Sequence, residues 1–169
     1  MASKIIELNP ADFITVGTIG PKGQRIFHLQ SGKGGQLISL TIEKEQALAL
    51  SEAIREMLDD LQDRHPDLTF SGTVDLAGVD MELREPIEPL FRVAQMGLGY
   101  DEDRDMIVLV AQEMVVVDEN ADPSLLEPSV VRMWCSRQQM RWLSAYALEV
   151  VKSGRADPRM NGRLTYYWT

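Results

Sequence analysis

Cysteine and histidine are both scarce in this sequence. Cys135 is the only cysteine, so an internal disulfide is impossible and a reducing compartment suits the chain. The two histidines, His28 and His65, are far apart and belong to no zinc-binding pattern of the C-x₂-C or H-x₃-H type. We therefore predict no metal and no other cofactor, and neither histidine stands out as a catalytic residue.

Long apolar runs are also missing. The longest nearly uncharged stretch, residues 106–117, is interrupted by Gln112 and Glu113. It is shorter than the ~20 residues that a membrane helix needs, and it is typical of a strand. Residues 1–10 contain Glu7 and lack the apolar core of ~7 to 15 residues found in a signal peptide. These absences predict a cytoplasmic protein without a membrane segment.

Charge is unevenly distributed along the chain. The net charge of −9 disfavours a protein whose whole surface attracts nucleic acid. From Val130 onward, however, basic residues outnumber the two acidic ones, Glu149 and Asp157, which makes the C-terminal quarter a basic patch on an acidic protein. The basic residues are Arg132, Arg137, Arg141, Lys152, Arg155, Arg159 and Arg163.

Glycine-rich turns divide the first part of the chain into short apolar segments. The turns at residues 20–23 and 32–35 are typical of hairpins, because glycine adopts the positive φ that tight turns need. After residue 43, apolar side chains recur at spacings of three and four, which predicts a helix to about Asp63. The three predicted strands before it are Phe13 to Ile19, Arg25 to Gln30 and Leu37 to Ile42.

The second half of the chain follows the same plan. Its pattern predicts a helix from Arg137 to Ser153, and Ser136 and Gln139 have the spacing of a capping box at its start. The strands predicted before this helix are Phe91 to Leu98, Met106 to Val117 and Val130 to Trp134.

A shift of 93 positions aligns the two halves without a gap, placing residues 37–41 on 130–134 and Leu50-Ser51 on Leu143-Ser144. Either the chain contains an ancient duplication, or two amphipathic strand-helix pairs merely look alike. The first reading predicts an α+β fold of two repeated βββα units with pseudo-two-fold symmetry, in which antiparallel sheets pack against two helices and each helix covers its own half.

The length of the chain favours a single domain over residues 1–169. The predicted divisions are repeat 1 at about 12–63, a linker at 67–89, repeat 2 at about 90–153 and a C-terminal tail at 154–169. The linker is acidic, and a short strand is predicted near Val79 to Leu83.

Strand alternation gives the most specific candidate for a binding surface. Arg132 and Trp134 share one face of their strand, and the equivalent positions of the first half are Ser39 and Thr41. An exposed arginine beside an exposed tryptophan can hold a flat anion or a base by charge and stacking. Alternatively, Trp134 packs under the C-terminal tail.

The C-terminal tail is the second candidate. Its basic and amide side chains, Arg159, Asn161 and Arg163, precede the aromatic residues Tyr166, Tyr167 and Trp168. Aromatic residues at a chain end normally dock somewhere, so we expect the tail to close a groove on its own domain or to fill one on a second subunit.

Two other patterns are weaker. The carboxylates at positions 101, 102, 103 and 105 crowd one predicted hairpin loop and could attract a hard cation, but a solvated turn explains them better. The turn lysines Lys22 and Lys33 lie between strands, unlike the lysine of a phosphate-binding loop, which leads into a helix.

Several short blocks carry a resemblance to a known family. They are Phe13-x-x-x-Gly17-Thr18-x-Gly20-Pro21, Gly23-Gln24-Arg25-x-Phe27-x-Leu29-Gln30, Glu43-Lys44-Glu45-Gln46, Glu85-Pro86 and Phe91-Arg92-Val93. In these blocks the chain resembles a bacterial family of conserved cytoplasmic proteins of unknown function, many of which end in a zinc-ribbon-like tail.

The resemblance implies a zinc-binding tail of the form C-P-x-C-G followed by C-P-R-x-N-G. This chain departs from it, because Asp157-Pro158-Arg159-Met160-Asn161-Gly162 has aspartate in place of the cysteine and the earlier C-x₂-C is absent. The departure argues against zinc binding here, while the retained Pro-Arg-x-Asn-Gly pattern favours docking of the tail for a structural reason.

These observations favour a non-catalytic binding or protein-interaction module that uses the sheet face with Arg132 and Trp134 and the basic C-terminal quarter. Its partner would be another protein, a second copy of the chain or single-stranded nucleic acid. The alternative is a small-ligand protein or metal-assisted enzyme with a carboxylate-lined site between the repeats.

Overall fold

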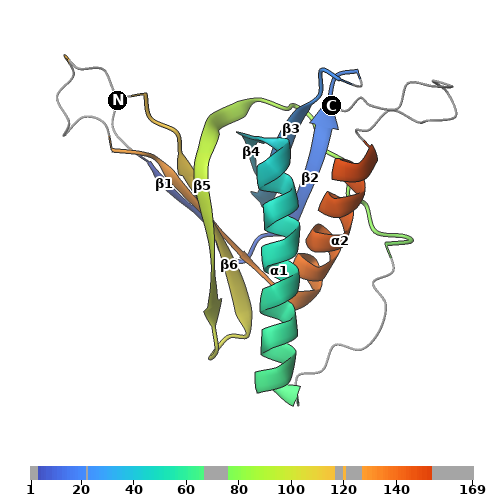
Figure 1. The fold of residues 1–169 in the computed structure, drawn as a ribbon. Coiled ribbons are helices and arrows are strands. Elements are labelled where there is room, and N and C mark those ends of the chain that lie inside the picture. The colour runs from blue at the N-terminus through green and yellow to red at the C-terminus, as the bar shows by residue number, and fades with distance from the viewer. Residues whose placement is uncertain (1–3, 22, 67–75, 117–119, 121–126, 154–169) are drawn as a thin grey trace, which may run out of the picture.

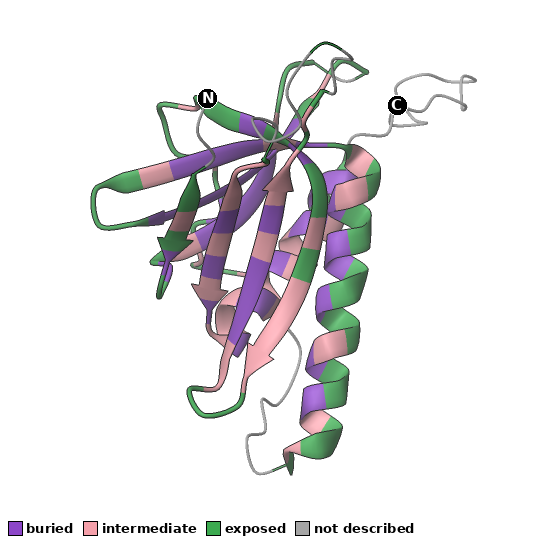
Figure 2. Cartoon of the chain, turned by 90° about the vertical axis from the view of Figure 1, so that its left-hand side faces the viewer, coloured by how far each residue is buried: buried purple, intermediate pink, exposed green. Residues whose placement is uncertain are grey.

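The computed structural model describes residues 4–21, 23–66, 76–116, 120 and 127–153. Seven strands form one sheet in the order β1-β7-β6-β5-β4-β3-β2, and two helices lie on the same side of it (Figures 1 and 2). The elements are β1 (Ile5–Leu8), β2 (Phe13–Ile19), β3 (Ile26–Lys33), β4 (Gln36–Ile42), α1 (Lys44–Arg64), β5 (Pro89–Asp101), β6 (Met106–Glu113), β7 (Val130–Cys135) and α2 (Arg137–Ser153). The predicted α+β class is confirmed.

Each half of the sheet is an antiparallel meander of three consecutive strands. β2, β3 and β4 form one meander, and β5, β6 and β7 form the other. The two meet where β4 runs parallel to β5, with Leu40 beside Phe91 and Thr41 beside Arg92. β1, which the sequence pattern did not predict, pairs in parallel with β7 at the far edge.

One apolar face of the sheet packs against both helices. In β7, Val131, Met133 and Cys135 are buried, while Arg132 and Trp134 between them are only half-buried, as the two-residue period of a strand requires. The buried residues of the sheet and of both helices form one continuous cluster. Among the described residues, no helix is both long and apolar enough to span a membrane.

Both helices begin with a capping box, which satisfies backbone N–H groups that have no partner inside the helix. The N–H of Glu43 donates to Oε1 of Gln46 (2.8 Å), and the N–H of Ser136 donates to Oε1 of Gln139 (2.8 Å). Gln139 returns a bond from its own N–H to Oγ of Ser136 (3.1 Å), so the predicted box at this position is confirmed.

Residues that lie 93 positions apart make matching contacts in the structure. Ser51 Oγ donates to the carbonyl of Ser144 (2.6 Å), and Ser144 Oγ donates to the carbonyl of Ser51 (2.7 Å), at the seam between α1 and α2. The side-chain amide of Gln46 donates to the carbonyl of Val93 (3.2 Å), and that of Gln139 donates to the carbonyl of Ala11 (3.0 Å). A pseudo-two-fold axis between the helices would produce such pairs, which supports the internal repeat as a proposal.

The helices do not cover the halves as the sequence predicted. α2 follows β7 in the chain but lies along β2, the first strand of the other half, and α1 packs against α2. The sheet curls enough to allow this, because the N–H of Ala11, just before β2, donates to the carbonyl of Trp134 at the end of β7 (2.8 Å). The expectation that each helix covers its own half is therefore wrong.

Residues 76–88, which we call the covering segment, lie over the outer face of the first meander. Thr15 Oγ1 donates to the carbonyl of Met81 (2.6 Å), and Gln30 exchanges two hydrogen bonds with the backbone of Arg84 (2.7 and 2.8 Å). A Cβ on Gly17 would lie 2.5 Å from Cγ of Leu83, so glycine is needed for this close approach.

Two expectations fail at the covering segment. No strand forms near Val79 to Leu83, because the segment binds the sheet through scattered side-chain contacts instead of a backbone ladder. Ser39 is only 2% exposed and accepts a hydrogen bond from the side-chain amide of Gln30 (3.0 Å). It therefore cannot belong to an open sheet face as predicted, although Thr41 next to it is half-buried.

Candidate functional site

A groove runs between α1 and β5 on the helix side of the sheet. It begins where β4 ends: β4 pairs with β5 as far as Thr41 and Arg92, the chain then turns into α1 after Ile42, and β5 continues with β6 alone beside α1 (Figure 1). The groove encloses about 370 Å³. Its lining residues are Gln46, Ala49, Leu50 and Ala53 of α1, Ala94, Gln95, Met96, Gly97 and Leu98 of β5, and Leu109 of β6.

The floor of the groove is apolar, and side chains from α1 and from His65 contact β5 near its two ends. Leu50 and Leu109 at the floor are almost fully buried. At one end, the side-chain amide of Gln46 bridges the strand by donating to the carbonyls of Val93 and Ala94 (3.2 and 3.4 Å). At the other end, the His65 ring after α1 lies 6.2 Å from the Tyr100 ring of β5.

Two alanines give the groove its width. Ala49 and Ala53 are exposed, and at the positions 93 residues later α2 has Trp142 and Tyr146. Those two aromatic residues are half-buried where α2 packs along β2, and Tyr146 contacts the core. The aromatic residues narrow the equivalent place beside α2 without filling it, because a cavity of about 310 Å³ remains there between Trp142, the start of β2 and the covering segment.

The groove follows the edge of β5 and not one of its faces. Residues 94–98 line it in unbroken succession, although alternate side chains of a strand point to opposite faces. From Gln95 to Asp101, β5 pairs with β6 on one side, and no strand among the described residues pairs with its other side. We call this side the groove edge of β5. Its backbone N–H and C=O groups face the groove.

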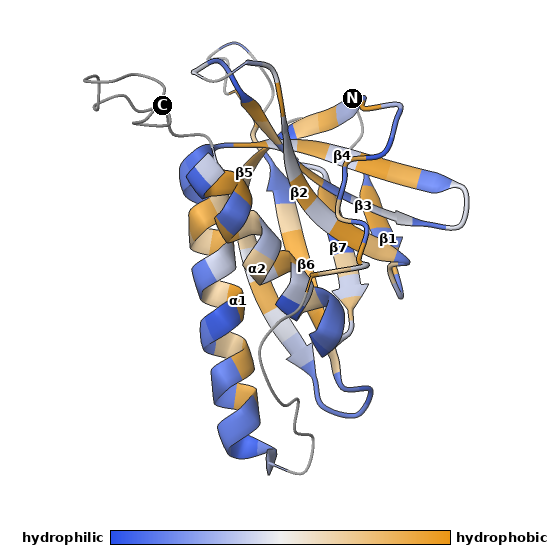
Figure 3. Ribbon diagram, turned by 90° about the vertical axis from the view of Figure 1, so that its right-hand side faces the viewer, coloured by the Kyte–Doolittle hydropathy of each residue, from blue (hydrophilic) through white to orange (hydrophobic). Residues whose placement is uncertain are grey.

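The helix side of the groove has an acidic rim. Glu45, Glu52 and Glu56 are exposed and lie three or four residues from Ala49 or Ala53, so they flank the alanines on the solvent side of the helix. Figure 3 shows the hydrophilic outer surface of α1 beside its apolar inner surface. The carboxylates of Asp101 and Glu102 lie in the β5–β6 turn, near the far end of the groove.

An ion pair anchors the β5–β6 turn to α2. Nε of the buried Arg137 donates to Oδ1 of Asp105 (2.9 Å), and the hydroxyl of Tyr100 donates to the same oxygen (2.7 Å). Burial raises the pKa of Asp105, but the hydrogen bonds from Tyr100 and Arg137 and the guanidinium charge outweigh it and hold the pKa below its ordinary value. Burial and the hydrogen bond to Asp105 raise the pKa of Tyr100 to about 12.

The Asp105 pair predicts a specific pH dependence of stability. A carboxylate whose folded pKa is lowered adds stability above its unfolded pKa of ~3.9 and loses that contribution as pH falls through the folded pKa. We expect Asp105→Asn to lower the free energy of unfolding by about 1 kcal/mol at pH 7, discounted for the partial exposure of the carboxylate. The difference from the wild type should shrink as pH falls below ~4.

Urea unfolding at several pH values between 7 and 3 measures this difference. Asp103→Asn is the matched control, because Asp103 is an exposed carboxylate in the same turn. A deficit of Asp105→Asn that stays constant down to pH 3 would contradict the account, and so would an equal deficit in the control.

Arg132 and Trp134 lie together on the outer face of β7, as predicted, but both contact a residue that the prediction missed. The indole N–H of Trp134 donates to Oε1 of Glu7 in β1 (3.0 Å), and Nη1 of Arg132 lies 3.9 Å from the same oxygen. The guanidinium of Arg104 lies 5.1 Å from the Trp134 ring centre. The predicted tail residues Arg159, Asn161 and Arg163, and the zinc-tail position Asp157, lie outside the described residues.

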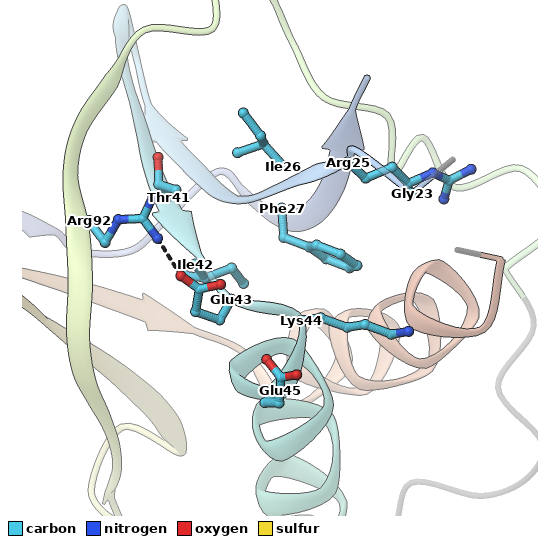
Figure 4. Close-up of a pocket in the computed structure, with 10 residues that line it drawn as sticks. All are labelled: Gly23, Arg25, Ile26, Phe27, Thr41, Ile42, Glu43, Lys44, Glu45 and Arg92. Atoms are coloured by element: carbon cyan, nitrogen blue, oxygen red, sulfur yellow. Dashed lines mark hydrogen bonds and ion pairs between the residues drawn. The ribbon is translucent and has the colours of Figure 1, made fainter. Parts of the chain in front are cut away.

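A second cavity, of about 310 Å³, lies where β3 and β4 meet the start of α1 (Figure 4). Its lining contains the basic side chains of Arg25, Lys44 and Arg92 and the acidic side chains of Glu43 and Glu45. Arg92 forms an ion pair with Glu43, and Arg25 donates to Oγ of Ser153 at the end of α2 (3.2 Å). Charges of both signs therefore line this cavity.

The described residues provide no constellation for metal or acid-base chemistry. They contain no group of three His, Cys, Asp or Glu side chains that could hold a metal ion. His28 is buried in β3, and burial lowers its pKa. Burial raises the pKa of the Cys135 thiol to about 12, so it is unreactive near neutral pH. Asp101 accepts backbone hydrogen bonds from Asp103 and Arg104 within its own turn.

The fold and the groove define a mixed α+β protein. Its candidate binding site lies between α1 and the edge of β5 that has no partner strand among the described residues. The chain belongs to the family described as "Protein of unknown function (DUF3090)", whose model matches residues 6–161. No curated protein and no solved structure matches the chain significantly. The resemblance found in the sequence is thus confirmed at the level of the family, which assigns no activity.

Proposed function

We propose that the chain is a non-catalytic cytoplasmic binding protein that holds a partner in the groove between α1 and β5. The observation that carries the proposal is an apolar groove beside an edge of β5 that no described strand pairs with. Ala49 and Ala53 are exposed, and Met96 and Leu98 across the groove are only half-buried. A partner that covers these side chains gains free energy, because burial of apolar surface is worth roughly 25 cal/mol per Å².

Binding fits the lining of the groove better than catalysis. Its side chains are alanine, leucine, methionine and two amides, together with Gly97. None of these is a nucleophile, a general base or a metal ligand of the usual kinds. The alternative of a carboxylate-lined enzyme site between the two halves has less support, because the cavity of about 320 Å³ between the helices has a single carboxylate, that of Asp59, in its lining.

A second surface is proposed on the outer face of β7, where Arg132 and Trp134 remain half-exposed. Glu7 lies between them and lowers their attraction for phosphate, which favours a protein partner over single-stranded nucleic acid there. Retention of a single-stranded oligonucleotide at ~50 mM salt would reverse this preference, because such binding weakens steeply with salt.

A peptide library displayed on phage tests the groove proposal. Random 12-residue peptides are selected on the full chain and then assayed on Ala53→Trp, which places a large aromatic side chain in the groove at the position equivalent to Tyr146 of α2. We expect selected peptides to lose at least ~30-fold in affinity on this variant, the equivalent of about 2 kcal/mol of lost contacts. Leu48→Trp is the matched control, since Leu48 is a partly exposed residue of the same helix turned away from the groove.

Thermal unfolding of each variant is measured alongside, and Ala53→Trp is expected to be as stable as Leu48→Trp. The proposal is wrong if every selected peptide binds Ala53→Trp as well as it binds the wild type. Peptides released by Trp134→Ala instead of Ala53→Trp would transfer the binding site to the outer face of β7.

A further inference from the structure

The groove edge of β5 points to a particular kind of occupant. Resting on the proposed function, we infer that the partner is an extended segment of a second protein that adds to β5 as a strand and carries basic residues at its flanks. Its backbone pairs with the edge from Gln95 to Asp101, and its alternate apolar side chains cover the half-buried Met96 and Leu98. Its lysines or arginines face the acidic rim of α1.

The backbone of β5 supplies the first reason. Between Gln95 and Asp101 this strand pairs with β6 only, so half of its N–H and C=O groups point toward the groove without a partner strand in the described chain. Such an edge is a template for another strand, and strand addition is a common mode of peptide recognition. An extended main chain matches these groups, whereas a helix uses its own backbone groups internally.

At the end of the groove near Gln46, a side chain of α1 already forms hydrogen bonds with the backbone of β5. The carbonyls of Val93 and Ala94 accept the side-chain amide of Gln46, so hydrogen bonding from the α1 side begins there and the incoming strand continues it. The β-bulge between Val93 and Gln95 turns the strand at this point. Bulges of this kind bend a strand, and β4 itself ends at Ile42, so the edge of β5 beyond this point is left without a partner strand among the described residues.

The apolar lining fixes how the added strand is patterned. Met96 and Leu98 lie on the core side of β5 but are only half-buried. The facing residues of α1 are Ala49 and Ala53, whose side chains are too short to cover them. Side chains of an added strand lie beside those of β5 on the same face, about 4.8 Å away. Apolar residues at every second position of the peptide would therefore cover Met96 and Leu98.

Charge selects the partner. The rim residues Glu45, Glu52 and Glu56 are exposed, and the chain as a whole carries a net charge of −9. A second copy of the chain would bring the same acidic rim against this one, and like charges in contact are destabilising. A peptide with basic flanks is instead attracted, and the attraction weakens as salt screens it.

The test uses the peptides selected on the full chain. Versions that carry N-methyl groups at alternate backbone positions are compared, one set blocking each edge of the peptide. We expect one set to lose about tenfold or more in affinity and the other to lose little, since only one edge of an added strand pairs with β5. A peptide bound as a helix would lose affinity with both sets.

The charge requirement is tested on the protein. The double variant Glu52→Lys with Glu56→Lys is expected to lose about tenfold in affinity at low salt and less at 1 M salt. Glu149→Lys, at an exposed carboxylate of α2, is the matched control and should change affinity less than twofold, within the usual effect of a remote surface charge.

The outcomes separate this inference from the proposed function. Groove-dependent peptides with apolar residues at helical spacing, equally sensitive to both N-methyl sets, would overturn strand addition and leave the groove as the site. Groove-dependent peptides without enriched lysine or arginine would overturn the basic partner. Absence of any peptide that Ala53→Trp releases would overturn the proposed function itself.

Discussion

Replacing Arg137 by alanine is expected to lower the free energy of unfolding by about 2 kcal/mol, because a buried guanidinium loses its charge-assisted hydrogen bonds to a carboxylate that is itself 38% exposed. Arg137 is 8% exposed and holds Asp105 through Nε and Nη2 (2.9 and 3.2 Å). It is the first residue of α2, so its loss also separates the β5–β6 turn from the helix. Urea unfolding at pH 7 measures the change.

Arg132→Ala is the control for this prediction. Arg132 belongs to the neighbouring strand β7, but its side chain is 43% exposed and its contact with Glu7 spans 3.9 Å. A surface pair of this kind is worth about 0.5 kcal/mol or less. If Arg137→Ala cost no more than Arg132→Ala, the pair with Asp105 would not be the anchor of the turn.

Replacing Ser51 by leucine is expected to cost about 2 to 3 kcal/mol, because extra side-chain volume in a closely packed interior forces its neighbours apart. Ser51 is 4% exposed at the seam of the two helices, with its Oγ only 2.6 Å from the carbonyl of Ser144. Ser51→Ala keeps the close packing and loses one hydrogen bond, so it should cost about 1 kcal/mol.

The equivalent substitution in the second half, Ser144→Leu, tests the same contact from the other helix. If an axis of pseudo-symmetry passes between the two serines, Ser144→Leu should destabilise the chain to a similar extent as Ser51→Leu. Chemical denaturation of both variants provides the comparison. A cost below that of Ser51→Ala for either leucine variant would contradict the close seam.

Elements with a strong local pattern were predictable from the sequence. The bounds predicted for β2 and α2 agree with the structure, because each has a clear period and a turn or cap at its limits. β1 was missed because four residues are too short to display a period, and its pairing with β7 joins distant parts of the chain. The covering segment has no period at all, since side-chain bonds hold it.

The candidate site was harder to predict for a physical reason. Sequence patterns register side chains that are present, whereas the groove exists because Ala49 and Ala53 leave space. The alignment of the two halves by a shift of 93 positions contained the necessary signal, because it pairs Ala49 with Trp142 and Ala53 with Tyr146. The outward direction of Arg132 and Trp134 followed correctly from strand alternation.

The contact of Arg132 and Trp134 with Glu7 was not predictable once β1 had been missed. The parallel pairing of β4 with β5 was also beyond the sequence pattern. It joins strands that are about fifty positions apart in the chain, which no local period records.

Backbone amide hydrogen exchange along β5, measured with and without a selected peptide, tests the central claim most directly. If the peptide adds as a strand, those amides between Gln95 and Asp101 that do not donate to β6 should exchange more slowly in the complex, while amides of β3 remain unchanged. Slower exchange in β7 around Arg132 and Trp134, with β5 unaffected, would contradict the claim.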